Sequence, residues 1–374
     1  MVHFANLQLA TQRCCRFYGS PREGGRLRFP VFALSSSSGE NAMKAVLKRH
    51  LAMGTTLVLT SLAVHAQGAP LIYGLVDLSI GSTKAPGGTS STTLDSGKMT
   101  TSFIGLGASE DLGGGLSATA RFESFLRANT GGLGRFYGDP AFSRTASVSL
   151  SSKTLGTLSL GRNTTALFVS TLLFNAFGDS FGYSPSIRHY FTSGTVTGDT
   201  GWSDSFAYSS PSLGGVRFGV AGATKTNGTD ESDGSNWSLN LGYGSGPLTS
   251  SIVVQRVTKD GTSPVDDTRT AQIGGAYDFG AAKVFAQYGE VENLTTSAKY
   301  KVSGLGARFP VGTSALVAQW GHLNASESDD RNTLSVGMLH NLSKRTELYA
   351  VAMHDKVEGI SSGAGYSVGI RHRF

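Results

Sequence analysis

Apolar and polar residues alternate one by one along most of the chain after Gln67. Residues 237–243 read Trp-Ser-Leu-Asn-Leu-Gly-Tyr, with apolar side chains at every second position. Residues 366–374 alternate in the same way up to the last residue, Phe374. A period of two is that of a β-strand with one apolar and one polar face. The pattern predicts an all-β fold, and we find no comparable helical period.

Sixteen segments with this pattern can be delimited, and most are about ten residues long, the length of a tilted strand that crosses an outer membrane. Short turns and longer polar loops alternate between them, which is typical of a transmembrane antiparallel β-barrel with its turns toward the periplasm. The predicted strands are 71–80, 101–109, 116–126, 143–151, 155–162, 203–210, 214–223, 236–244, 248–257, 269–279, 282–291, 300–309, 313–322, 331–341, 345–354 and 364–374.

The second face of the predicted strands is polar, made of Gly, Ser, Thr, Asn, Gln and charged residues. A soluble β-sandwich has to pack two apolar inner faces together, so the polar face argues against that fold. A polar face suits a water-filled lumen, and closure of the sheet removes the strand edges that lipid cannot satisfy. The 50 glycines fit a strongly curved and closely paired wall.

A secretory signal peptide is predicted over residues 43–66. Lys44, Lys48 and Arg49 form a basic region after the methionine, and residues 51–64 form an apolar region too short to span a bilayer as a stable helix. Small residues then precede Ala66, after which we expect cleavage. Gram-negative export to the outer membrane, with a mature chain that begins near Gln67, follows from this reading.

The remaining parts of the chain are residues 1–42 and the predicted barrel, 67–374. Residues 1–42 are rich in Arg and Ser and have no apolar periodicity, so we interpret them as a mis-annotated extension from a start codon placed too early; a genuine extension is the alternative. Residues 1–66 hold 8 of the 32 Lys+Arg and 2 of the 26 Asp+Glu, which leaves 24 of each sign in the barrel. No basic patch for nucleic acid remains.

Catalytic signals are weak throughout the barrel. Residues 365–369 fit the pattern G-x-S-x-G, but a nucleophile elbow needs a following helix, and this segment lies in the last predicted strand. Both cysteines, Cys14 and Cys15, precede the barrel, and its five histidines show no metal-binding spacing. We therefore expect no enzyme activity, no cofactor and no metal.

Several stretches resemble the general porins of beta-proteobacterial outer membranes. The most specific is 105–116, Gly-Leu-Gly-Ala-Ser-Glu-Asp-Leu-Gly-Gly-Gly-Leu, which is similar to their second strand, first turn and third strand. Residues 71–77, 143–162 and 368–374 resemble their first strand, the hairpin before the constriction loop and the last strand. The resemblance implies a homotrimer of sixteen-stranded barrels, an inward-folded third loop, contact with outer-membrane lipid and lipopolysaccharide, and a terminal Phe374 that the barrel-assembly machinery reads as an assembly signal.

The predicted pore constriction involves the long unpatterned stretch 163–200, because so long a loop in a compact fold is usually functional. Opposed charges across a narrow aqueous section set a transverse field. Strand parity places Asp77, Arg121 and Glu123 on the polar face, and the resemblance adds two arginines. For Arg144 the two arguments conflict, since simple alternation places it on the outward face. The constriction residues expected are Asp77, Arg121, Glu123, Arg144, Arg162 and Asp179.

The leading functional prediction is a passive diffusion channel for small hydrophilic solutes and ions. Phe103 and Gly107 stand where members of the family often carry basic residues, so any anion preference should be mild. Two alternatives remain open: an outer-membrane enzyme such as a barrel lipase, and an adhesin or structural barrel with a closed pore. Sixteen strands and a polar lumen favour the channel, because a barrel of this size leaves an aqueous path.

Overall fold

A computed structural model describes residues 69–196, 200–224, 236–258 and 267–374. The predicted extension, 1–42, and the predicted signal peptide, 43–66, lie outside the described residues. No helix in the described part of the chain is long and apolar enough to cross a membrane.

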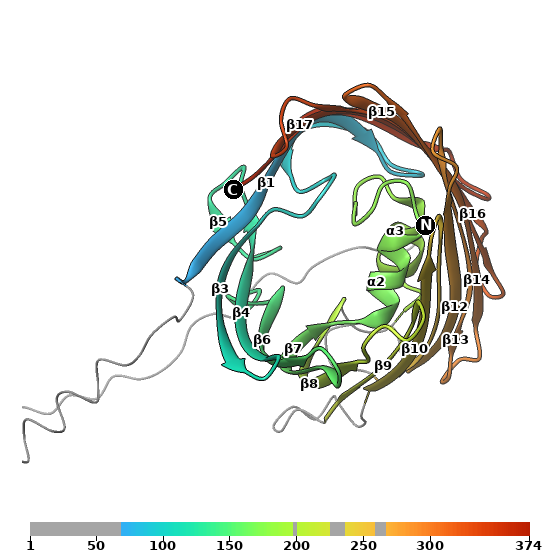
Figure 1. Cartoon of the computed structure of the whole chain (residues 1–374). Helices are drawn as coiled ribbons and strands as arrows, with labels where there is room; N and C mark the ends of the chain where they lie inside the picture. The colour runs from blue at the N-terminus through green and yellow to red at the C-terminus, as the bar shows by residue number, and fades with distance from the viewer. Residues whose placement is uncertain (1–68, 197–199, 225–235, 259–266) are drawn as a thin grey trace, which may run out of the picture. The chain divides into compact units, whose positions relative to one another are not determined.

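A single antiparallel sheet closes on itself into a barrel, because β1 pairs with both β18 and β3 (Figure 1). Sixteen strands form the wall, which confirms the predicted barrel, and two short strands, β2 and β5, were not predicted. The strands are β1 (Leu71–Lys84), β2 (Ser90–Ser96), β3 (Phe103–Gly113), β4 (Leu116–Arg127), β5 (Gly132–Leu133), β6 (Thr145–Ser152), β7 (Gly156–Thr164), β8 (Gly201–Ser209), β9 (Val216–Ala223), β10 (Asn236–Ser245), β11 (Leu248–Val257), β12 (Thr268–Asp278), β13 (Lys283–Asn293), β14 (Lys299–Val311), β15 (Ser314–Ala325), β16 (Arg331–Asn341), β17 (Thr346–Val357) and β18 (Gly363–Arg373).

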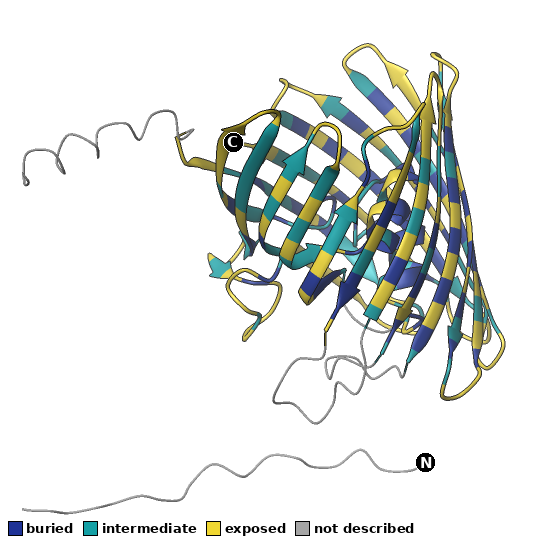
Figure 2. Cartoon of the chain, turned by 60° about the horizontal axis from the view of Figure 1, so that its bottom comes forward, coloured by how far each residue is buried: buried dark blue, intermediate teal, exposed yellow. Residues whose placement is uncertain are grey.

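The wall strands alternate between exposed and buried positions, as the banding in Figure 2 shows. On β12 and its neighbour β11, Ile273 and Ile252 point outward, while Gln272 and Gln255 are buried inside. An outward apolar belt is what a lipid-facing barrel requires, and the inward amides suit a wet lumen. The period of two in the sequence therefore reports correctly which side chains face lipid.

The second wall strand is interrupted, which the sequence did not predict. β2 pairs with residues 78–84 of β1 and β3 pairs with residues 71–75, so β2 and β3 share one side of β1. Residues 97–102 lie between them and are called the inward turn. Its amides bond to Asp77, and its Lys98 carbonyl accepts hydrogen bonds from the Ser180 hydroxyl and the Gly182 amide. The inward turn is thus held between the wall and the long loop that fills part of the barrel.

That long loop, called loop 3, joins β7 to β8, and its residues 165–196 are described. It lies inside the ring of strands in Figure 1 and contains α2 (Ala166–Leu173) and α3 (Pro185–Phe191). Thr165 and Ser184 cap the two helices, since their hydroxyls accept from the amides of Phe168 and Ile187. The prediction of an unpatterned loop missed both helices, because seven or eight residues give too few turns for a clear period.

Loop 3 rests on the inner face of β10 to β16, where glycines leave room for it. A Cβ added at Gly321 would lie 2.6 Å from Cβ of Pro185, and one at Gly274 would collide with the ring of Phe174. Phe174 and Phe177 are buried in a cluster with wall residues such as Phe285. The main apolar core of the barrel therefore lies between loop 3 and one side of the wall, and the rest of the lumen is left open.

Candidate pore constriction

A cavity of about 450 Å³ lies between the tip of loop 3 and the wall. The loop contributes Asn175 to Asp179, and the wall contributes side chains from β1, β3, β13, β14, β16 and β18, together with residues just before β3 and β6. Four arginines line this cavity against a single carboxylate, Asp179. The arginines are Arg144, Arg308, Arg371 and Arg373.

Two of these arginines are paired with carboxylates. Arg371 lies 2.7 Å from Glu347, and Arg144 lies 2.9 Å from Glu123. Arg371 also donates to the Thr100 hydroxyl at 2.8 Å, which in turn donates to Asp179 at 3.0 Å. A hydrogen-bonded chain therefore connects the basic wall, the inward turn and loop 3.

Arg308 and Arg373 differ, because no residue in the described part of the chain forms an ion pair with them. They leave the cavity with more positive than negative charge. Neither arginine is among the constriction residues predicted from the sequence, although strand parity places Arg373 on the polar face of β18 with Arg371. The sequence does not tell how high on the wall a side chain sits or which part of loop 3 it faces.

The position of Arg144 settles the conflict between parity and resemblance. Arg144 precedes the first residue of β6, Thr145, and so lies outside the regular alternation of that strand. Its guanidinium stacks over the ring of Phe103 at 4.2 Å and faces Glu123, which also accepts a 2.6 Å hydrogen bond from Tyr73. The side chain therefore points into the barrel.

Arg121 and Arg162 occupy different surroundings. Arg121 is exposed on β4, across from Gly107 of β3 and Ser147 of β6. The Arg162 guanidinium donates to the Ser143 carbonyl and, at 3.0 Å, to the Ser203 hydroxyl. Arg162 thus fastens the ends of two loops, whereas Arg121 presents its charge to water.

Asp77 does not present its charge to the lumen. It is 0% exposed, and its carboxylate accepts hydrogen bonds from the amides of Met99 and Thr100 at 2.7 and 2.8 Å and from the Tyr349 hydroxyl at 2.7 Å. The residue expected to face the pore on parity alone is buried, because the inward turn covers it. Its geometry is that of an anchor for the turn.

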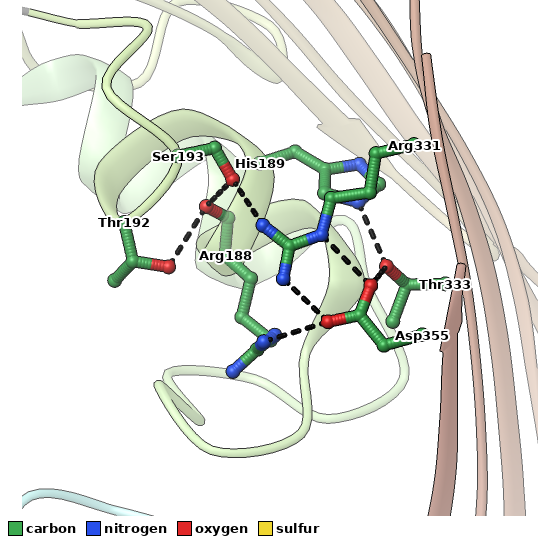
Figure 3. A network of polar contacts seen from close by, with 7 residues as sticks. All are labelled: Arg188, His189, Thr192, Ser193, Arg331, Thr333 and Asp355. Atoms are coloured by element: carbon green, nitrogen blue, oxygen red, sulfur yellow. Dashed lines mark hydrogen bonds and ion pairs between the residues drawn. The ribbon is translucent and has the colours of Figure 1, made fainter. Parts of the chain in front are cut away.

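A second anchor fixes the far end of loop 3 and centres on the buried carboxylate of Asp355 on β17 (Figure 3). Arg188 of α3 lies 2.9 Å from it, Arg331 of β16 contacts both of its oxygens, and the Thr333 hydroxyl donates at 3.0 Å. His189 is bonded to Thr333 at 2.9 Å. Arg188 and Arg331 share this one carboxylate, so removal of the carboxylate would leave two positive charges partly buried without a counter-ion.

A model of the family described as Gram-negative porin matches residues 54–359. The chain belongs to the Gram-negative porin family. Outer membrane porin protein 32 of Delftia acidovorans is 29% identical over 345 residues, which cover 83% of this chain and 96% of that protein. An outer membrane porin protein of Bordetella pertussis is 26% identical over 396 residues, which cover 88% of this chain and 100% of that protein.

Among solved structures, the anion-selective porin from Comamonas acidovorans is similar, with a TM-score of 0.70 and 25% identity over 82% of this chain and 99% of that one. OmpT of Vibrio cholerae, solved in a trimer form, matches with a TM-score of 0.61 at 15% identity, which supports the fold alone. The porin described here is therefore an outer-membrane diffusion channel, as its sequence predicted.

The porin's G-x-S-x-G segment forms no nucleophile site in the structure. Ser367 lies inside β18, is buried, and its hydroxyl bonds to the Tyr183 hydroxyl of loop 3. The strand continues past it to Arg373 without a helix, so the geometry of an elbow is missing. Ser367 instead attaches loop 3 to the last strand.

Proposed function

We propose that this porin is a mildly anion-preferring channel and that the cavity beside the tip of loop 3 is its selectivity filter. The observation that carries the proposal is the unpaired charge of Arg308 and Arg373 beside a single loop carboxylate, Asp179. Low-dielectric walls behind a narrow aqueous section strengthen such a field. The relation to an anion-selective porin is consistent with the same sign.

The proposed constriction residues divide into two groups. Arg308, Arg373 and Asp179 set the field in this cavity, and Arg121 adds an exposed positive charge on the neighbouring wall strand β4. Arg144 with Glu123 and Arg371 with Glu347 contribute paired charges whose net effect is smaller. Asp77 and Arg162 act by holding the loops in place. This division replaces the uniform set of six that the sequence suggested.

The test uses two variants of opposite sign. Arg121→Gln should move the zero-current potential in a KCl gradient toward cation preference, and Asp179→Asn should move it toward anion preference. Lys153→Gln in a short exposed turn is the matched control and should have no effect. If both lumen variants leave the potential unchanged while the channels still conduct, the filter lies elsewhere.

We further propose that the porin works as a homotrimer, with outer-membrane lipid and lipopolysaccharide around it. The support is the barrel type and the trimer form of a related fold. Gel migration of unheated and heated outer-membrane protein, with chemical crosslinking in the membrane, tests this. A band of one chain's mass in both the unheated and the crosslinked sample contradicts the trimer.

We also propose that the chain is exported by cleavage of a signal peptide after Ala66 and that Phe374 serves as an assembly signal. Cleavage there should give a mature chain that begins at Gln67, and N-terminal sequencing of the outer-membrane protein checks it. Peptides from 1–42 in that material would refute the misplaced start.

Phe374 pairs with Gly74 of β1 through both backbone groups at 3.2 Å, so it closes the barrel seam. Deleting it should lower membrane yield, in keeping with a signal read by the assembly machinery; an unchanged yield at low expression would exclude that role.

A further inference from the structure

A second cavity, of about 610 Å³, lies on the other side of loop 3, between α2 and the inner face of β7 to β11. It differs from the constriction in its chemistry. The wall here presents small residues such as Ala207, Gly219, Ala221 and Gly242, which leave space in front of the helix. The two cavities flank the loop segment at Phe174 and Asn175.

The face of α2 that borders this cavity is apolar apart from Ser170, which is buried. Ala166, Val169 and Leu173 follow one another at spacings of three and four, so they share one face of the helix. Val169 is 39% and Leu173 is 53% exposed, although both lie inside the barrel. Thr171 on the opposite face accepts from Gln272 at 2.9 Å, and Ser170, which also borders the cavity, bonds to Ser251 at 2.8 Å, so both hold the helix to the wall.

Exposed aliphatic side chains in an aqueous channel are informative, because a solvated polar residue could cover the same helix face without an apolar surface in water. They offer an apolar contact surface to a solute that itself has an apolar part. A small hydrophilic ion gains nothing from such a contact.

One cation completes the cavity. Arg217 projects from the start of β9, at the turn end of the wall, and lines the same cavity. None of the residues that the structure describes pairs with its guanidinium. A guanidinium binds a carboxylate through two parallel hydrogen bonds, so Arg217 suits the head of an organic acid whose apolar part lies against α2.

We propose that this cavity is a binding subsite for monovalent organic acids with an apolar body, such as aromatic carboxylates. The apolar body contacts Val169 and Leu173, and the carboxylate meets Arg217. The subsite rests on the proposed anion-preferring channel, but it adds recognition by shape and apolar contact to a filter that responds only to charge. Acids of this class should linger in the lumen, while small hydrophilic anions pass.

The experiment records chloride current through the reconstituted full-length porin while benzoate or acetate is added at equal ionic strength. The two acids share a head group and charge, and they differ in the apolar body. Benzoate should reduce the chloride current in a saturable way, and acetate should not. Benzylammonium, which carries the same ring with a positive head, should not reduce it either.

Two variants locate the effect. Val169→Ser with Leu173→Ser should raise the half-blocking benzoate concentration by roughly fivefold, since about one kcal/mol of apolar contact is lost. Arg217→Gln should raise it by a similar factor. The matched controls are Leu133→Ser in the short strand β5 and Arg269→Gln, whose guanidinium pairs with Glu292; benzoate should block both variants at the wild-type concentration.

Three results overturn the subsite: equal effects of benzoate and acetate, block by benzylammonium at the same concentration, or benzoate block that neither lumen variant weakens. The zero-current potential in KCl alone, recorded on the same channels, tests the anion preference separately. A cation-preferring wild type would refute the proposed function, whereas a difference between benzoate and acetate would still report on the apolar face.

Discussion

Loop 3 separates two walls of unlike chemistry. On the side of its tip, the lumen is lined by arginines from β14 and β18 and by Asp179. On the side of α2, the wall from β7 to β11 carries small residues, and the helix offers Val169 and Leu173. One inserted loop thus gives the same barrel a charged surface that sorts ions by sign and an apolar surface that can retain solutes. The difference arises from which residues stand at the inward positions, since the backbone pattern is the same on both sides.

Both walls depend on the position of loop 3, and two buried carboxylates fix that position. Asp77 binds the inward turn on which the tip of the loop rests. Asp355 binds α3 through Arg188. Loss of either anchor should let loop 3 move and so reduce the difference between the two sides of the lumen.

Asp355→Asn should be the most damaging change. It would leave Arg188 and Arg331 partly buried without their carboxylate, at a cost of about 3–5 kcal/mol. We expect a lower temperature for the heat-induced gel shift and noisier open-channel current as α3 detaches. Asp329→Asn, an exposed carboxylate in the loop between β15 and β16, is the control. An unchanged transition temperature would show that this network does not hold the loop.

Asp77→Ala should cost about 3 kcal/mol, because two amides of the inward turn and the Tyr349 hydroxyl lose a buried acceptor. The tip of loop 3 should shift while α3 stays attached, so ion selectivity should weaken more than benzoate block does. The heat-induced gel shift and the KCl zero-current potential measure the two effects. Glu110→Gln, on an exposed part of β3, is the control. If selectivity is retained in Asp77→Ala, the inward turn does not position the filter.

Gly321→Ala should cost about 1–3 kcal/mol, because its new Cβ would lie 2.6 Å from Cβ of Pro185 and push the start of α3 off the wall. Gly107→Ala is the matched control, since the nearest atom there is 3.5 Å away. The difference between their gel-shift temperatures is the measurement. Equal temperatures would mean that loop 3 is not seated as closely as the structure shows.

A mild acid dependence is the smallest effect expected. Burial, reinforced by the charge of Arg331, holds the pKa of His189 at about 3, below its ordinary 6.5. His189 is neutral in the folded porin, whereas an unfolded chain would gain a proton below pH 6.5. Stability from this residue should therefore be lost as pH falls from about 6.5 toward 3. His189→Gln should flatten the decline of the gel-shift temperature between pH 7 and 5, and an unaltered decline would assign it to other groups.

Much of the barrel could be predicted from the sequence, because each wall strand has one face toward lipid and one toward water. The segment 248–257 was predicted with the bounds that β11 has. β2 was missed because its residues, Ser-Ser-Thr-Thr-Leu-Asp-Ser, are polar on both faces and give no alternation. The inward turn followed from that miss, since its existence depends on where β2 ends and β3 begins.

The site was less predictable than the fold. Strand parity placed both Arg121 and Asp77 on the lumen-facing side of the strands. Arg121 is exposed there, whereas the inward turn covers Asp77 and buries it. Arg308 and Arg373 lay on the polar face by the same parity and went unrecognised. Their proximity to Asp179 depends on strand tilt and on the path of loop 3, which hydrophobic periodicity does not encode.

The most direct test of the charged wall is the zero-current potential of the double variant Arg308→Gln, Arg373→Gln in a tenfold KCl gradient. The wild type should prefer chloride mildly. Each lost charge should lower the chloride-to-potassium permeability ratio by roughly fivefold, because a unit charge about 4 Å from an ion in water is worth about 1 kcal/mol. A wild type that prefers potassium, or a double variant with the wild-type potential and normal conductance, would contradict the account.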